Sequence, residues 1–295
     1  MRKTIEGPQI NVDMAHGNHS NASTFDLPPE SRGEAPGRGR IVGRRVLVVG
    51  AGQTDYHMDA QPIGNGRAIS LLLAREGARV AASDYDKSAA DGTVELVTAG
   101  GGQATAMIAD VRNPSEVEEM VEHACDWLGG LDGVVYNVGI TGPVSFEDTT
   151  PEAWDNTFNV NLRGAMLTAR AALRFMEPGS AFVFISSIAA LTPRGRLISY
   201  SASKAGMAAL MRDVAFAGNE RSIRANIVML GGIDTGIERD HGRRHAPPLP
   251  IYQGMPMGRH GTAWETAYLT LFLLSQESAY ITGQVVAIDG GLTTL

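Results

Sequence analysis

The strongest chemical pattern in the chain is YSASK, in which Tyr200 and Lys204 lie four residues apart. On a helix this spacing places both side chains on one face. An ammonium beside a phenol favours the phenolate, so we expect the pKa of Tyr200 to be drawn down from about 10 toward neutral. Such a phenol could pass a proton to a carbonyl oxygen. Because a tyrosine and a lysine at this spacing are also a common exposed pair, the surrounding residues must decide between the two interpretations.

Two other polar residues could join this pair. FISS ends an apolar run, so Ser187 is expected at a strand end, with Ser186 as the alternative. Strand ends of a doubly wound sheet form the ligand crevice, where a hydroxyl could donate to the oxygen that Tyr200 protonates. Asn161 in FNVNLRG is expected inside a helix, where an amide is not favoured, and a proton-relay role would explain it. The predicted catalytic set is Asn161, Ser187, Tyr200 and Lys204.

Apolar runs alternating with helical patterns surround these residues. Seven such runs begin with RVLVVG at residue 45 and end with QVVAIDGG. Between them the pattern predicts helices after the glycine turn, at 87–99, after Pro114, and at 151–177, 199–218 and 262–275. A crossover between parallel strands needs a helix and has a fixed hand. The sequence therefore predicts an α/β protein with a doubly wound seven-stranded parallel sheet, the Rossmann fold, and helices on both faces.

The stretch GAGQTDYHMDAQPIGNGRA, residues 50–68, resembles a dinucleotide-binding turn that has been pushed apart. Without residues 54–63, GAGQ joins GNGRA with a glycine spacing that fits such a turn. Glycines there permit the bend and let a pyrophosphate approach the helix N-terminus. We therefore interpret residues 54–63 as a loop inserted into a working turn. The predicted cofactor-binding glycines are Gly50, Gly52, Gly64 and Gly66.

Two acidic positions follow the next strands. Asp84 ends the second apolar run, where a carboxylate can bind the adenosine ribose hydroxyls. It would repel a 2'-phosphate, which favours NAD over NADP, although Arg44 and Arg67 lie close in sequence. Asp110 and Val111 follow the third run and are predicted beside the adenine. Helix capping by Asp110 is the alternative.

These motifs, in this order, resemble the short-chain dehydrogenase/reductase family, and the resemblance covers residues 45–295. It implies a single-domain NAD(P)-dependent oxidoreductase that moves a hydride between the nicotinamide and a secondary alcohol or ketone. Tyr200 would be the general acid/base, and Lys204 would also reach the nicotinamide ribose. The resemblance implies further cofactor contacts at Asn137, Gly139, Gly231, Ile233 and Thr235, besides those of Tyr200 and Lys204.

Besides the insert, the chain departs from the family pattern at two places. The usual NNAG is YNVG, with Tyr136 and Val138 substituted. Leu230 replaces the proline that usually precedes the glycine turn, which leaves φ freer and could loosen the wall under the nicotinamide. These two departures alone favour the alternative that the chain is a non-catalytic dinucleotide-binding protein. A second alternative is an epimerase or dehydratase of the same fold that retains its cofactor.

The organisation outside the motifs is simpler. Residues 1–40 are rich in Asn, Gly, Pro, Ser and His without apolar periodicity, which predicts a flexible N-terminal arm before a catalytic domain at 41–295. Residues 233–260 are predicted to form a substrate lid. Its Arg and His residues could steer an anionic substrate, but a solvated face is the preferred interpretation.

Composition excludes several classes. The net charge of -7 argues against a nucleic-acid partner, which needs a basic face. Cys125 is the only cysteine, so an intrachain disulfide is impossible and a reducing compartment is expected. No apolar run suits a membrane span or a signal peptide, so we expect a cytoplasmic protein. His16 and His19 do not form a metal pattern, and no metal is predicted. By resemblance, the protein should form a homodimer or homotetramer through its long helices.

Overall fold

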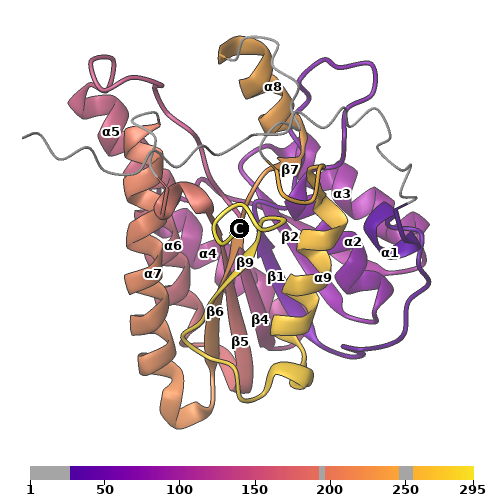
Figure 1. The fold of residues 1–295 in the computed structure, drawn as a ribbon. Helices are drawn as coiled ribbons and strands as arrows, with labels where there is room; N and C mark the ends of the chain where they lie inside the picture. Colours follow the sequence, from indigo (N-terminus) through magenta and orange to yellow (C-terminus); the bar gives the residue numbers. More distant parts are fainter. Residues whose placement is uncertain (1–26, 193–196, 246–254) are drawn as a thin grey trace, which may run out of the picture.

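The structure is a computed structural model that describes residues 27–192, 197–245 and 255–295 (Figure 1). At its centre is a seven-stranded sheet in the order β3-β2-β1-β4-β5-β6-β9, in which every neighbouring pair is parallel. The strands are β1 (Arg45–Val49), β2 (Arg79–Asp84), β3 (Gln103–Ile108), β4 (Leu131–Tyr136), β5 (Met176–Ser187), β6 (Arg224–Leu230) and β9 (Val285–Ile288). Each coincides with one of the seven apolar runs, so the predicted doubly wound sheet is confirmed.

Helices cover both faces of this sheet, as predicted. One face carries α2 (Asn65–Arg75), α3 (Lys87–Ala99) and α9 (Ala263–Leu274). The other carries α4 (Pro114–Leu128), α6 (Gly164–Ala172) and α7 (Ile198–Gly218). Successive side chains of a strand point to opposite faces of the sheet. Along β1, Leu47 therefore packs in the core on the side of α4, α6 and α7, and Val48 packs in the core on the side of α2, α3 and α9. The sheet is therefore buried on both sides.

The helix predicted at 151–177 is divided and shorter. α5 (Pro151–Phe158) continues into a π-helix at Asn159–Arg163 and then into α6, which ends at Ala172. The chain leaves the helix at Leu173 and enters β5 at Met176, and the proline at 178 further biases Glu177 toward an extended backbone. The predicted end at 177 was wrong for this reason.

The last part of the predicted arm, residues 27–40, makes defined contacts with the domain. Residues 27–40 contain the short helix α1 (Pro29–Arg32) and run along α2 and α9. The backbone N–H groups of Arg38 and Arg40 both donate to Glu76 Oε2, at 2.9 and 3.0 Å. Polar composition concealed these contacts, since they are made by the backbone. The remainder of the arm lies outside the described residues.

The chain reverses its direction of winding between β1 and β4, which opens a crevice at the carboxyl ends of these strands. Above it, β7 (Ile233–Asp234) pairs with β8 (Gly261–Thr262), and α8 (Gly236–His245) follows β7. In Figure 1, α8 stands at the top of the molecule beside the loop that follows β1. Within the described ranges, no helix combines the length and apolarity needed to cross a bilayer.

Candidate active site

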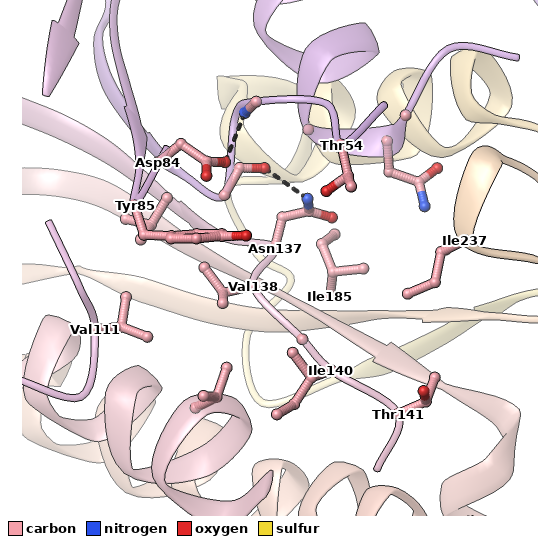
Figure 2. Close-up of a pocket in the computed structure, with 18 of the residues that line it drawn as sticks. Thr54, Asp84, Tyr85, Val111, Asn137, Val138, Ile140, Thr141, Ile185 and Ile237 are labelled. Carbon is pink, nitrogen blue, oxygen red and sulfur yellow. Dashed lines mark hydrogen bonds between the residues drawn. The ribbon is translucent and has the colours of Figure 1, made fainter. Parts of the chain in front are cut away.

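A cavity of about 790 Å³ occupies the crevice. Its size falls within the range typical of small-molecule and cofactor sites. The residues predicted for the adenosine, Asp84, Asp110 and Val111, line one part, and Tyr200 and Lys204 line another. Figure 2 shows Asp84 and Val111 on one side of the cavity, with Asn137 at its centre. The structure thus brings the two predicted halves of the site into one space.

Tyr200 and Lys204 both project from α7. The Lys204 ammonium donates to the carbonyl oxygen of Ile185 at 2.9 Å and lies 5.8 Å from the centre of the Tyr200 ring. Only 4% of Lys204 is exposed, and this burial lowers its pKa to about 8. The predicted pairing on one helical face is therefore present, with its cation largely removed from water.

The expected direction of the Tyr200 pKa was wrong. Burial raises the pKa of Tyr200, a hydrogen bond with the Ser187 side chain opposes this effect, and the Glu238 carboxylate raises it further. The cost of placing a phenolate away from water outweighs the favourable partners. The hydrogen bond places the Ser187 hydroxyl, at the end of β5, beside the phenol, although Ser187 is not among the residues that line the cavity. The alternative, Ser186, does line it, and its hydroxyl donates to the Lys204 carbonyl oxygen at 3.1 Å.

Asn161 is fully buried in the π-helix between α5 and α6. Its Nδ2 donates to the carbonyl oxygen of Ile140 and to Ser203 Oγ, both at 3.0 Å, and its Oδ1 accepts from the Ile140 N–H at 2.8 Å. The amide thereby joins the segment after β4 to α7. Short π-turns inside α-helices are frequent at functional sites. Asn161 is not among the residues that line the cavity, and the hydrogen bonds described for it are made to other parts of the protein.

The glycine turn is intact. Gly50 has φ of +82°, a left-handed conformation that glycine adopts without strain. A Cβ on Gly66 would lie 1.9 Å from the Gly50 carbonyl oxygen, so only glycine lets the start of α2 approach β1 so closely. Gly52 packs similarly on Ala89. A Cβ on Gly64, the N-cap of α2, would meet only ordinary contacts at 3.9 Å or more.

The N-terminus of α2 also offers an unsatisfied group to the cavity. Asn65 Oδ1 is buried without a hydrogen-bond partner, and Asn65 lines the cavity. Buried polar atoms normally find a partner, so this one is suited to a bound polar ligand. Because an amide oxygen accepts, the partner it lacks would be a donor such as a hydroxyl group. The crowded Gly50 and Gly66 contact and the positive end of the helix dipole fit the diphosphate of a dinucleotide.

The Asp84 side chain is held in place by the turn. Its Oδ2 accepts from the Gly52 N–H at 2.9 Å, shown dashed in Figure 2. Burial raises its pKa, because the carboxylate loses water. The two nearby arginines point elsewhere. Arg67 donates to Thr93 Oγ1 at 3.0 Å, and Arg44 donates to the Leu274 carbonyl oxygen at 3.2 Å.

The other predicted cofactor residues divide into two groups. Asn137, Gly139 and Thr235 line the cavity, whereas Gly231 and Ile233 do not. Gly231 is required instead for packing, since a Cβ there would lie 2.6 Å from the Asp289 Cα. Ile233 is buried in the β7–β8 pair, and Thr235 Oγ1 donates to its carbonyl oxygen at 3.4 Å.

Asp110 has no capping role. Its carboxylate accepts from the Arg112 guanidinium and backbone N–H, and these bonds lower its pKa. The N-cap of α4 is Asn113, whose side chain accepts from the Ser115 N–H. The capping alternative was therefore wrong.

Comparison with known proteins agrees with this geometry. Residues 60–293 match a family described as enoyl-(acyl carrier protein) reductase. The chain is 32% identical to a 3-oxoacyl-[acyl-carrier-protein] reductase of Thermotoga maritima over 86% of this chain and 99% of that protein. It is 33% identical to an L-rhamnose 1-dehydrogenase (NAD(P)(+)) of Azotobacter vinelandii, over 85% of this chain and 97% of that one.

Solved structures decide the family. The short-chain dehydrogenase/reductase of Serratia marcescens aligns with a TM-score of 0.78 and 30% identity, covering 86% of this chain and all of that one (100%). A dehydrogenase/reductase from Sinorhizobium meliloti aligns with a TM-score of 0.77 and 29% identity, covering 87% and 97%. The chain belongs to the short-chain dehydrogenase/reductase family. It is an oxidoreductase of a family that uses NAD(P).

The structure accounts for the first departure from the usual pattern of short-chain dehydrogenases/reductases. Tyr136 ends β4 fully buried, and its hydroxyl donates to the Val160 carbonyl oxygen in the π-helix. Burial raises its pKa strongly. A Cβ on Gly164 would lie 2.4 Å from the Tyr136 hydroxyl, so the large phenol and the glycine fit together. Tyr136 thus supports the helix that carries Asn161.

Leu230, the second departure, does not leave the wall loose. It is the last residue of β6 and pairs with Ser187 on one side and Ile288 on the other. The next N–H, that of Gly231, donates to the Ile288 carbonyl oxygen at 3.0 Å. The sheet ladder therefore fixes the backbone that a proline would otherwise restrict.

Tyr136→Phe is expected to destabilise the fold by about 1–3 kcal/mol, because the buried Val160 carbonyl oxygen loses its side-chain donor. Urea unfolding measures this change. The matched control is Tyr280→Phe, since Tyr280 is fully exposed and should tolerate the same change without cost. Equal stabilities of the two variants would refute the role given to the Tyr136 hydroxyl.

Residues from the inserted loop and from the predicted lid also form a wall of the cavity, although the sequence predicted none of them individually as site residues. This wall is formed by the insert and by α8, through Gln53, Thr54, Tyr56, Gln61, Gly236, Ile237 and Asp240. Of the lid cations, Arg239 is paired with Asp234 at 2.6 Å, and the side chains of residues 241–245 lie outside the described part. Among described residues, no group of His, Cys, Asp or Glu could hold a metal ion.

Proposed function

We propose that this protein transfers a hydride between NAD(H) and a secondary alcohol or ketone, with Tyr200 as the general acid/base. One observation carries the proposal. A single cavity joins a dinucleotide turn and the Asp84 carboxylate to the Tyr200 phenol and the Lys204 ammonium. The Ser187 side chain forms a hydrogen bond with Tyr200. The relatives named above are a reductase and a dehydrogenase, which supports the same reaction class.

The residues divide the chemistry as follows. Ser187 would donate a hydrogen bond to the substrate oxygen and hold it beside the Tyr200 hydroxyl. Tyr200 would give its proton to that oxygen during reduction and take it back during oxidation. Lys204 would favour the phenolate in the moment when it forms, since a cation stabilises a neighbouring anion. Asn161 would keep the segment at Ile140 in place. Bound NAD(H) would supply or accept the hydride.

NAD is the cofactor that the adenosine end of the cavity favours. Asp84 would accept hydrogen bonds from the ribose hydroxyls and would repel a 2'-phosphate. Recognition of that phosphate needs a guanidinium or ammonium, but Arg67 donates to Thr93 and Ala89. Arg112, which also lines this end, is bound to Asp110.

Asp84→Asn should raise the affinity for NADPH relative to NADH by about tenfold, the effect of removing roughly 1.4 kcal/mol of repulsion. The amide keeps an acceptor for the Gly52 N–H, so the turn should remain folded. Fluorescence titration with both reduced cofactors gives the two dissociation constants.

The matched control is Asp86→Asn, which removes the same charge two residues away, at the N-cap of α3. It should leave the ratio of the two dissociation constants unchanged. A wild-type protein that binds NADPH more tightly than NADH would contradict the NAD assignment.

A substrate screen tests the reaction itself. The panel should contain simple secondary alcohols, aldoses and a 3-hydroxyacyl thioester. The readout is the near-ultraviolet absorbance of the NADH that forms. Net NADH formation supports the dehydrogenase. Conversion without net NADH would indicate an epimerase or dehydratase instead.

We also propose that the protein self-associates and resides in the cytoplasm. Phe216 on α7 is 84% exposed and Met166 on α6 is 38% exposed, so both helices present apolar side chains outward. Sedimentation analysis would give the oligomeric state, and a monomer at micromolar concentration would contradict the first part.

Cys125 is a free thiol, which suits a reducing compartment.

A further inference from the structure

The loop inserted into the glycine turn has a defined internal structure. The Tyr56 N–H donates to Gln61 Oε1 and Gln61 Nε2 donates to the Thr54 carbonyl oxygen, both at 2.7 Å. At its base, the Gly64 N–H donates to Gln53 Oε1 at 2.9 Å. Gln61 therefore closes the loop on itself, and Gln53 ties it to the start of α2.

This loop touches α8 on the other side of the crevice. A Cβ on Gly236, the first residue of α8, would lie 2.6 Å from Cδ2 of the Tyr56 ring. One turn along α8, Arg239 donates to the Ala60 carbonyl oxygen at 3.2 Å while it pairs with Asp234. The purple loop after β1 and the orange helix α8 accordingly stand together in Figure 1.

The contact lies over the cavity. Thr54 and Tyr56 from the loop line it, as do Ile237 and Asp240 from α8. Figure 2 shows Thr54 and Ile237 to the right of Asn137, on the side of the view away from Asp84 and Val111. Asp84 and Tyr200 line the same cavity as these four residues, so a ligand that fills it from Asp84 to Tyr200 would share the cavity with both sides of this junction.

We propose that the insert is a cofactor-retaining element, and that its contact with α8 holds the dinucleotide in place. This inference rests on the proposed function. The Thr54 hydroxyl would donate to the diphosphate beside the positive end of α2. Release of the cofactor would require Tyr56 and Gly236 to separate. Movement of α8 would therefore govern cofactor exchange.

The test uses the close fit of Tyr56 and Gly236. Gly236→Ala forces the ring and the helix apart, and Tyr56→Ala removes the ring. Each should raise the NADH dissociation rate by about tenfold, a coupling typical of residues in contact. In the double variant the added methyl group meets no ring, and its remaining close neighbour is Gln61 Nε2 at 3.2 Å, the end of a flexible side chain. The rate of the double variant should therefore match that of Tyr56→Ala alone. Stopped-flow displacement of NADH measures these rates without requiring a substrate.

Two controls accompany the series. Gly100→Ala adds a methyl group at the end of α3, where its nearest contact would be an ordinary 3.4 Å, and Tyr280→Ala removes an exposed ring. Both should release NADH at the wild-type rate. If Gly236→Ala and Tyr56→Ala did so too, retention by the insert would be refuted while the proposed function stood.

Two further outcomes are decisive. If the increases in NADH dissociation rate caused by Tyr56→Ala and Gly236→Ala multiplied in the double variant, the two changes would act independently. Their contact would then not explain cofactor retention, and the inference would be overturned. A wild-type protein that binds neither NADH nor NADPH would overturn the inference and the proposed function together.

Discussion

Tyr200→Phe is expected to lower kcat by about 10²- to 10⁴-fold, the contribution typical of a positioned general acid or base. The ring remains to fill the same space, so the loss isolates the hydroxyl that bonds to Ser187. NADH affinity should be unchanged, because the proposed dinucleotide contacts come mainly from the turn and Asp84. Steady-state kinetics with the best substrate of the screen, together with an NADH titration, measures both quantities.

The control for this change is Tyr85→Phe. Tyr85 also lines the cavity, but at the end that holds Asp84, and it is 73% exposed. Its hydroxyl takes no part in the proposed proton transfer, so kcat should be preserved. Turnover by Tyr200→Phe at the wild-type rate would end the proposal that this phenol is the acid/base.

Lys204→Met should have the second largest effect on activity. It should lower activity but raise the stability of the folded protein. The variant loses the cation beside Tyr200, and we expect kcat/KM to fall by about 10²-fold or more. The folded protein should nevertheless become more stable at pH 7, although the Ile185 carbonyl oxygen loses its donor and this loss, about 1 kcal/mol, offsets part of the gain. Burial lowers the pKa of Lys204 from 10.5 to about 8, a cost of about 3 kcal/mol for the charged form that the variant does not bear.

The pH dependence checks this account. Because the folded pKa of Lys204 lies below the unfolded one, the unfolded chain binds more protons between pH 8 and 10.5. Wild-type stability should therefore rise relative to that of Lys204→Met across this window and remain constant relative to it below pH 8. Urea unfolding at several pH values gives the difference. A constant difference from pH 7 to 10.5 would show that the ammonium bears no burial cost.

The fold was predictable because its pattern is local. Each strand is a short apolar run, and helices such as α3 at Lys87–Ala99 follow from spacing and from nearby caps such as Asp86. Tyr200, Ser187 and Asp84 were predictable for a related reason, since each follows from its place at a strand end or on one helix face.

Other features depend on contacts that no local pattern records. Burial of Tyr200, which reverses the expected direction of its pKa, comes from the surrounding fold rather than from its neighbour Lys204. The position of the insert depends on Arg239 and Gly236, which are far from it in sequence. Residues 27–40 are fixed mainly through backbone groups, which every sequence possesses, so composition could not reveal their partners.

The π-helix at Asn159–Arg163 has a geometric consequence for the rod formed by α5 and α6. An α-helix turns by about 100° per residue, and a π-turn accommodates about one residue more than an α-turn. The azimuth of α6 is therefore offset from that of α5 by roughly this angle. α5 packs against α7 while α6 packs against α4, so one nearly continuous rod presents differently directed flanks to two neighbours. Deletion of one residue from the π-helix would bring the packing faces of α5 and α6 onto the same side. Either α4 or α7 would then lose its contact with this pair of helices.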